Sequence, residues 1–197
     1  TRNHYIICGL GGIGMKIARQ LHAQGHEVAV IENDDNNRFL HNARSLGIPI
    51  ILEDARLATT LKAANIHQAD TIIVVTSNDM VNVEIALTAK AIAPKLSVVL
   101  RSQDAQFSQS VQEVFEFDTV LCPSELATPS FAAAALGGKI LGNGMTDDLL
   151  WVALATMITA GHPFCGQIVK QAAMEADFVP LYLERKGHTI HGWNLLE

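Results

Sequence analysis

The sequence predicts an α/β fold, a doubly wound parallel sheet of six strands followed by a small α+β C-terminal subdomain. Short apolar, β-branched runs alternate with stretches of helical period through residues 1–136. The apolar runs are continuous, as in T-I-I-V-V-T at 71–76, which indicates strands buried on both faces. The 197 residues, 49% of them hydrophobic, suffice for one large domain and a small appendage.

Six βα units are expected in order along the chain. The strands are expected at 4–8, 27–31, 48–52, 71–76, 97–100 and 119–122. The helices are expected at 15–23, 38–46, 59–64, 81–93, 105–115 and 125–136. Apolar residues recur in these stretches at helical spacing, and Pro94 ends the fourth helix. Strands and amphipathic helices that alternate in this way predict a parallel sheet with helices on both faces.

The pattern changes after residue 136. Gly137, Gly138, Gly142 and Gly144 predict a flexible linker over 137–148. A strand at 149–158, a helix at 166–174 and a hairpin of 178–184 with 188–193 are expected after it, with Arg185-Lys186-Gly187 as the hairpin turn. The chain is therefore expected to consist of a domain at 1–136, the linker 137–148 and a subdomain at 149–197.

Charge, cysteines and hydropathy exclude several classes of protein. Lys and Arg number 14 and Asp and Glu 20, and the net charge of −6 argues against a nucleic-acid partner. Cys8, Cys122 and Cys165 are widely spaced and form no CxxC pair, so we expect buried thiols in a reducing compartment rather than disulfides or a zinc site. The apolar run that begins at Leu149 ends near Ala160, short of the roughly 20 residues of a membrane span. No secretory signal is visible, and a soluble, intracellular chain is expected.

A glycine motif of the form G-x-G-x-x-G lies between the first strand and the first helix. It comprises Gly9, Leu10, Gly11, Gly12, Ile13 and Gly14. The second strand then leads to Glu32, so that strand, motif, helix and acid follow the order of a Rossmann-like dinucleotide site. Gly9 permits the tight turn, Gly11 lets a pyrophosphate approach the backbone, and Gly14 lets the helix pack closely, with the N–H groups of the helix N-terminus holding the anion. Glu32 would accept from the adenosine ribose and repel a 2′-phosphate, which favours NAD over NADP. A glycine-rich turn without a ligand is the alternative.

Further motifs resemble a known family. They are H-Y-I-I-C-G-L-G-G-I-G-M-K-I-A, G-H-E-V-A-V-I-E-N-D, L-E-D-A-R at 52–56, I-H-Q-A-D-T-I-I-V-V-T-S-N-D-M-V-N at 66–82, L-C-P-S-E-L-A at 121–127 and T-A-G-H-P-F-C-G-Q-I-V at 159–169. Together they resemble the regulator-of-K⁺-conductance domain, also called the TrkA-N or KTN domain, with a TrkA-C subdomain. The resemblance covers essentially the whole chain. Glu53 stands where the family usually has glycine.

The resemblance implies further site residues. Asp54 would lie near the adenine and accept from its amino group, although a helix N-cap is the alternative. Thr76 and Ser77 would lie at the carboxyl end of the fourth strand, where a nucleotide crosses an open α/β sheet. Arg101 would face the phosphates or the second ribose, unless it pairs with an acid of the protein. Asp79 and Asn82 are expected to cap or stabilise the next helix and are left out of the site.

The resemblance also implies a function. The chain would bind NAD(H), or alternatively ADP or ATP, and gate a potassium channel or transporter by conformational coupling. It would be a cytoplasmic homodimer or higher oligomer (a gating ring) at the cytosolic face of the membrane, joined to a membrane subunit or domain and not to nucleic acid. No catalytic residue and no metal site are expected. The chain begins at Thr1 and lacks the family's final turn and strand, so we expect a piece of a longer protein with a truncated subdomain. The alternatives are an NAD-dependent oxidoreductase and a nucleotide sensor unrelated to ion transport.

Overall fold

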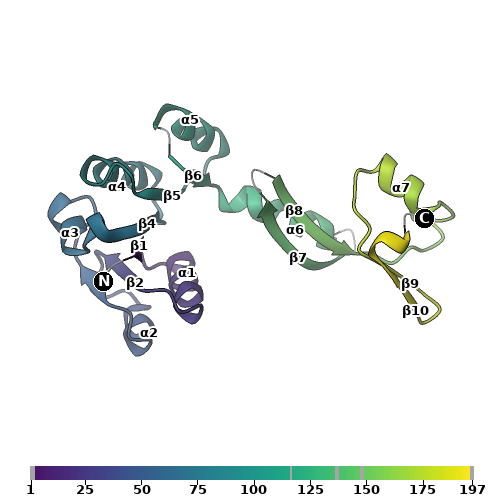
Figure 1. Ribbon diagram of the computed structural model, residues 1–197, viewed down its shortest axis with the longest axis horizontal. Helices are drawn as coiled ribbons and strands as arrows, with labels where there is room; N and C mark the ends of the chain where they lie inside the picture. Colours follow the sequence, from purple (N-terminus) through teal and green to yellow (C-terminus); the bar gives the residue numbers. More distant parts are fainter. Residues whose placement is uncertain (1–2, 116, 136–137, 147–148, 196–197) are drawn as a thin grey trace. The chain divides into compact units, whose positions relative to one another are not determined.

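The computed structural model describes residues 3–115, 117–135, 138–146 and 149–195. The chain divides into two compact units, Thr1–Phe131 and Ala132–Glu197 (Figure 1). Among the described residues, no helix combines the length and the apolar character needed to cross a membrane.

The first unit contains a six-stranded parallel sheet with the strand order β3-β2-β1-β4-β5-β6. Its strands are β1 (His4–Cys8), β2 (Val28–Glu32), β3 (Ile50–Leu52), β4 (Ala69–Val74), β5 (Ser97–Arg101) and β6 (Thr119–Leu121). Its helices are α1 (Gly12–Ala23), α2 (Leu40–Ser45), α3 (Ala58–Ala63), the 3₁₀ turn η1 (Ile66–Gln68), α4 (Asp79–Ile92), α5 (Ala105–Phe115) and the start of α6 (Pro123–Ala135). The prediction of a doubly wound parallel sheet with six βα units is confirmed.

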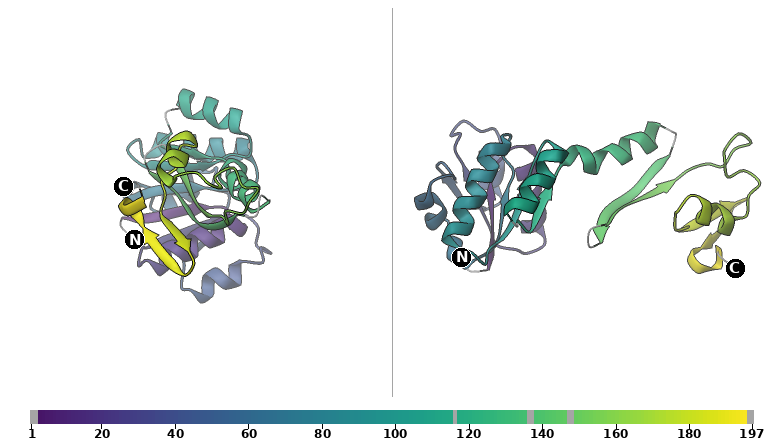
Figure 2. Two further views of the ribbon diagram at one scale, coloured as in Figure 1. Left: turned by 90° about the vertical axis from the view of Figure 1, so that its right-hand side faces the viewer. Right: turned by 90° about the horizontal axis from the view of Figure 1, so that it is seen from above.

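Alternate residues of the central strands contribute to two hydrophobic cores, one on each face of the sheet. Ile6 and Ile72 pack in the core that α3 and α4 cover, whereas Ile7 and Ile73 pack in the core that α1 and α2 cover. Successive side chains of a strand point to opposite faces, and helices cover both faces of the sheet (Figure 2), so Ile6 and Ile7 in β1 and Ile72 and Ile73 in β4 are all buried. This arrangement explains the continuous apolar runs of the sequence.

The three cysteines differ in their exposure. Cys8 lies inside β1, where burial raises the pKa of its thiol. Cys122 is also buried, and its Sγ donates to the carbonyl oxygen of Gln103 at 3.4 Å. Cys165 is exposed, so the expectation of three buried thiols is wrong there, because the turn that carries this residue is not covered by the core of its unit.

This difference in exposure predicts selective labelling. In the native protein, we expect a thiol reagent to modify Cys165 alone within minutes, because the reagent reaches this exposed thiol, whereas Cys8 and Cys122 are buried. In denaturant all three thiols should react. Mass spectrometry of the labelled peptides measures the sites, with Cys165→Ser as the control that should abolish the fast reaction. Rapid native labelling of Cys8 would contradict the packing of β1.

The second unit contains two antiparallel strand pairs and a short helix. β7 (Lys139–Thr146) pairs with β8 (Leu149–Ala155), and β9 (Tyr182–Arg185) pairs with β10 (His188–His191). α7 (Val169–Glu175) lies between the two pairs in sequence, and η2 (Gly192–Leu195) follows β10. The hairpin turn lies within the predicted segment but is one residue shorter, because Arg185 belongs to β9 and pairs with His188. Lys186 and Gly187 have φ angles of 51° and 78°, as a two-residue turn with two left-handed positions requires.

The predicted linker over 137–148 is wrong for most of its length. Residues Lys139–Thr146 form β7 instead of a flexible connection. The glycines do not prevent the strand, because the pairing with β8 shifts register between Ile140 and Gly142, and irregular pairs are where strands accommodate glycine. The predicted domain limits at 136 and 149 remain a proposal beside the structural division after Phe131.

Candidate functional site

The glycine motif forms the turn between β1 and α1, and its glycines have two different roles. Gly9 has a φ angle of +98°, and a Cβ added there would lie 3.1 Å from the backbone nitrogen of Thr76. A Cβ on Gly14 would lie 2.0 Å from the carbonyl oxygen of Gly9. Added Cβ atoms on Gly11 and Gly12 would meet no atom within 4 Å. Gly9 and Gly14 are therefore needed because the backbone packs too closely around them for a side chain, whereas Gly11 and Gly12 leave open space at the surface.

This turn lies at the point where the strand order of the sheet reverses. β2 and β3 extend to one side of β1, and β4, β5 and β6 extend to the other. In open α/β sheets, ligands bind outside the carboxyl ends of the strands at such a point. A Cβ added to Gly9 would lie within 3.2 Å of Thr76, so the motif lies directly beside the segment that follows β4.

The N-terminus of α1 is suited to an anion. α1 begins at Gly12, its N-cap Gly11 supplies no side-chain hydrogen bond, and its first turn contains no acidic residue. The first N–H groups of a helix have no intrahelical partner and carry partial positive charge. The other two residues of the motif contribute through the backbone, because the side chains of Leu10 and Ile13 pack in the hydrophobic core.

Glu32 ends β2 and joins two loops of the site. Its carboxylate accepts four hydrogen bonds, from the backbone nitrogens of Leu10, Asn33 and Asp34 at 2.7, 2.8 and 2.9 Å and from Asn37 Nδ2 at 3.1 Å. The residue is only 7% exposed. Four donors fill the acceptor positions of a carboxylate. A ribose hydroxyl at Glu32 would therefore take the place of one donor, and Asn37 supplies the only side-chain donor among them.

A shallow depression lies between the glycine turn and the loop after β2. Its volume is about 370 Å³, and Gly11, Gly12, Asp34, Asn36, Asn37, Arg38 and Phe39 line it. The guanidinium of Arg38 lies 4.7 Å from the centre of the Phe39 ring. Asn37 and Arg38 are not among the site residues that the sequence predicts. Their place in the loop directly after the predicted ribose acid is the signal that could have found them.

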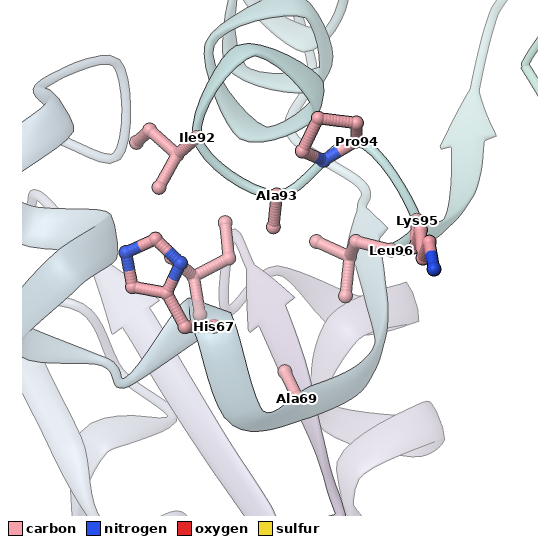
Figure 3. Close-up of a pocket in the computed structure, with 8 residues that line it drawn as sticks. His67, Ala69, Ile92, Ala93, Pro94, Lys95 and Leu96 are labelled. Carbon is pink, nitrogen blue, oxygen red and sulfur yellow. The ribbon is translucent and has the colours of Figure 1, made fainter.

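A second depression of about 380 Å³ lies at the opposite edge of the sheet (Figure 3). It is lined by Ile66, His67, Ala69, Ile92, Ala93, Pro94, Lys95 and Leu96. Ala69 begins β4, and Leu96 directly precedes β5, so this depression lies at the amino ends of the strands. Its position and its largely aliphatic lining separate it from the depression beside the glycine turn.

Thr76 and Arg101 meet across the carboxyl ends of β4 and β5, and Asn82 joins them. Asn82 Oδ1 accepts from the nitrogen of Thr76 at 3.1 Å and from its Oγ1 at 2.5 Å. Asn82 Nδ2 donates to the carbonyl oxygens of Thr76 at 3.2 Å and Arg101 at 3.0 Å. Arg101 Nη1 also donates to the carbonyl oxygen of Thr76, at 3.2 Å. The structure therefore brings two of the predicted site residues together.

Arg101 retains unused donor capacity. Its Nε is buried without a hydrogen-bond partner, and within the described residues Arg101 takes part in no ion pair. A buried guanidinium donor without a partner is costly, and carboxylate or phosphate oxygens match its geometry. The described residues thus provide no acid for the alternative of a protein ion pair.

The loops after β4 and β5 are also joined. Asp79 Oδ2 accepts from Ser102 Oγ at 3.0 Å and from the nitrogen of Gln103 at 2.8 Å. The exposed Ser77 contributes its carbonyl oxygen, which accepts from Gln103 Nε2 at 2.5 Å. The cap of α4 is Asn78, whose side chain accepts from the nitrogen of Val81. Asp79 is therefore not the cap of α4, one of the two roles expected for it, but lies in the first turn of the helix and holds the two loops together.

Asp54 has a partner of its own. Its carboxylate lies 2.6 Å from Arg56 Nη2 and also accepts from the backbone nitrogen of Arg56 at 2.9 Å. The hydrogen bond from the Arg56 side chain lowers the pKa of Asp54 below its usual range. The N-cap of α3 is Leu57, so the alternative of a helix cap does not hold either. Within the described chain, no hydrogen bond joins Asp54 to the glycine turn, Glu32 or Arg101.

The chain is similar to known proteins of potassium transport. The family model of the TrkA-N domain matches residues 5–123. The "Trk system potassium uptake protein TrkA homolog" of Pyrococcus abyssi is 36% identical over 162 residues, which are 74% of this chain and 70% of that protein. The "Voltage-gated potassium channel Kch" of Escherichia coli is 26% identical over 151 residues, 76% of this chain and 36% of the channel.

Solved structures share the fold at lower identity. The "GsuK channel bound to NAD" superposes with a TM-score of 0.64 at 17% identity, covering 98% of this chain and 34% of the channel chain. The "Shewanella denitrificans Kef CTD in AMP bound form" superposes with a TM-score of 0.60 at 20% identity, covering 68% of this chain and 80% of that one. At these identities, the likeness concerns the fold alone.

Proposed function

This chain belongs to the TrkA-N domain family, and from that premise we propose that it binds NAD(H) or an adenine nucleotide and thereby regulates a potassium channel or transporter. One observation carries the proposal, namely that groups suited to an anion gather at the carboxyl ends of the strands. The open glycines beside the N-terminus of α1 lie at the strand-order reversal, and Arg101 at the end of β5 has a buried donor without a partner. These are complementary to an anionic ligand that spans the ends of β1, β4 and β5.

The residues present fit a dinucleotide in one order across the crevice. The N–H groups at the start of α1 hold the pyrophosphate beside Gly11 and Gly12. Glu32 accepts a hydrogen bond from the adenosine ribose, and the ribose hydroxyl replaces the side-chain amide of Asn37 as a donor to this carboxylate. Thr76, Ser77 and Arg101 face the part of the ligand beyond the pyrophosphate. Asp54 can accept a hydrogen bond from the adenine amino group only if its carboxylate binds the adenine and Arg56 at the same time. ADP or ATP would use the same adenosine positions.

The crevice favours binding over catalysis. The carboxylate of Glu32 already accepts four hydrogen bonds, which occupy its acceptor positions, so it is placed to hold the turn and a ribose rather than to act on a substrate. Regulation then comes from differential affinity: a nucleotide that binds one conformation of an oligomer more tightly shifts the population toward it. A homodimer or larger ring, joined to a membrane protein at the cytosolic face, would transmit that shift to the pore. An NAD-dependent oxidoreductase is the alternative.

Calorimetry tests the proposal. Titrating the protein with NAD⁺, NADH, AMP, ADP and ATP should give saturable binding of at least one dinucleotide or nucleotide. An assay of NADH consumption with a panel of carbonyl compounds should give no turnover. If none of the five nucleotides binds at concentrations up to about 1 mM, the proposal fails. Sustained NADH oxidation would favour the oxidoreductase.

Arg101 gives the next prediction. Arg101→Gln should weaken NAD⁺ binding by about tenfold or more, because a charge-assisted hydrogen bond contributes about 1.5–3 kcal/mol and every 1.4 kcal/mol is tenfold. The free energy of unfolding should change by less than about 1.5 kcal/mol, because the variant loses the one hydrogen bond from Nη1 to Thr76 and also removes the buried Nε that lacks a partner. Calorimetry and urea unfolding measure the two effects. Arg19→Gln, which makes the same charge change on the exposed face of α1, is the control. An unchanged NAD⁺ affinity in Arg101→Gln would remove this residue from the site.

A further inference from the structure

We propose that Asn82 is a positioning residue that fixes Thr76 and Arg101 for the half of a dinucleotide that lies beyond the adenosine. This inference rests on the proposed function, and it assigns a role to a buried side chain that the sequence places merely in the first turn of a helix. Asn82 touches no part of the proposed adenosine site. Its effect would pass through the two residues that it holds.

The hydrogen bonds of Asn82 carry the inference. The residue is fully buried, at 0% exposure, and its side-chain amide makes four hydrogen bonds. Both lone-pair positions of Oδ1 and both hydrogens of Nδ2 are used, which is the full capacity of an amide. All four bonds end on Thr76 or Arg101. The side chain therefore serves these two residues and nothing else in the described part of the molecule.

A purely local role in α4 does not account for these contacts. The helix is capped by Asn78, and the backbone nitrogen of Asn82 donates to the carbonyl oxygen of Asn78 at 3.0 Å in the ordinary helical manner. The side chain leaves its own helix and reaches the last residue of β5 and the residue two positions after β4. These strands are direct neighbours in the sheet. Asn82 thus clamps the ends of two neighbouring strands, beside the predicted site residues Thr76 and Arg101.

The hydrogen bonds of Asn82 hold Arg101 at two places, its main chain and the far end of its side chain. Asn82 Nδ2 holds the carbonyl oxygen of Arg101, and it also holds the carbonyl oxygen of Thr76 that accepts from Arg101 Nη1. With the main chain and one end of the guanidinium fixed, Nε is the donor left over. An arginine held in its bound conformation before the ligand arrives loses less side-chain entropy on binding.

The position of the clamp makes the effect specific to one half of the ligand. The adenosine and its phosphate lie against the glycine turn and Glu32, which belong to β1 and β2. Only a ligand that continues past the pyrophosphate reaches Arg101 at the end of β5. Loss of the clamp should therefore weaken a dinucleotide and spare a mononucleotide.

The test compares NAD⁺ with AMP by calorimetry on matched variants. Asn82→Ala should weaken NAD⁺ by about tenfold and AMP by less than about twofold. Asn78→Ala removes the cap of the same helix without touching the clamp, and it should change neither affinity by more than about twofold. In an Arg101→Gln background, Asn82→Ala should cause no further loss of NAD⁺ affinity, because both changes remove the same contact.

Several outcomes would overturn the inference. Equal losses for AMP and NAD⁺, no loss for either, or losses that add to those of Arg101→Gln would mean that Asn82 supports the fold alone. If the wild-type protein binds neither ligand, the proposed function fails, and that result is separate from the comparison of variants. If Asn82→Ala does not fold by circular dichroism, Asn82→Asp replaces it. This isosteric variant keeps the acceptor for the nitrogen and Oγ1 of Thr76 but loses both hydrogen bonds that Nδ2 donates, to the carbonyl oxygens of Thr76 and Arg101, so it should still weaken NAD⁺ more than AMP.

Discussion

Gly14→Ala is expected to lower the free energy of unfolding by about 2–3 kcal/mol. The new Cβ would lie 2.0 Å from the carbonyl oxygen of Gly9 and 3.1 Å from its carbonyl carbon. Both atoms belong to the backbone of a turn that Thr76 confines on its other side, so the clash is not relieved by rotating a side chain. The gain of about 1 kcal/mol in helix propensity from glycine to alanine is too small to offset this strain.

Urea unfolding followed by far-UV circular dichroism measures this effect, and Gly12→Ala is its matched control. The control residue lies in the same turn of α1, and its added Cβ would meet nothing within 4 Å. We expect Gly12→Ala to leave the stability within about 0.5 kcal/mol or to raise it slightly. Nucleotide affinity should fall in Gly14→Ala because the turn is displaced. Equal stabilities of the two variants would show that α1 does not pack against Gly9 as described.

Glu32→Ala is expected to have the second large effect, on both stability and binding. The change leaves the backbone nitrogens of Leu10, Asn33 and Asp34 without their acceptor, and hydrogen bonds to a charged group each contribute about 1.5–3 kcal/mol. Water reaches the two nitrogens of the exposed loop, so we expect a loss of about 2–4 kcal/mol in the free energy of unfolding. Loss of the ribose acceptor and of the held turn should lower NAD⁺ and AMP affinity alike, by about a hundredfold.

Urea unfolding and calorimetry with both ligands separate the two consequences of Glu32→Ala. Glu27→Ala, an exposed acid just before β2, makes the same charge change and should alter neither quantity. The parallel loss of AMP and NAD⁺ distinguishes Glu32 from Arg101 and Asn82, whose variants should affect the dinucleotide selectively. Wild-type affinity for both ligands in a folded Glu32→Ala protein would refute the ribose assignment.

The sequence predicts those features of the site that depend on one segment at a time. The continuous apolar run at 71–76 predicts a strand buried on both faces, and the burial of Ile72 and Ile73 in different cores confirms it. The glycine turn and its acid are likewise set by a single β-α-β segment. Within the motif, the short distance from Gly14 to the carbonyl of Gly9 follows from the requirement that the helix begin close to the strand.

Features that depend on neighbours from distant segments could not be predicted in the same way. Asn82 and Arg101 are separated by 19 residues, and their contact depends on the register of β4 and β5 and on the direction of the first turn of α4. Asp54 shows the converse case, because a partner only two residues away, Arg56, takes the carboxylate that the family resemblance assigns to a ligand. The strand β7 was missed because glycine signals flexibility locally, whereas pairing with β8 is a property of the hairpin.

The hydrogen bond from Cys122 Sγ to the carbonyl oxygen of Gln103 affects which sequence changes this part of the chain can tolerate during evolution. It joins two residues 19 positions apart and closes the segment that contains α5 into a loop with fixed ends. Changing the length of a loop whose ends are held costs little entropy. Insertions or substitutions on the outer surface of α5, where Val114 is 70% exposed, should therefore accumulate without altering the geometry of the crevice or the point where α6 begins.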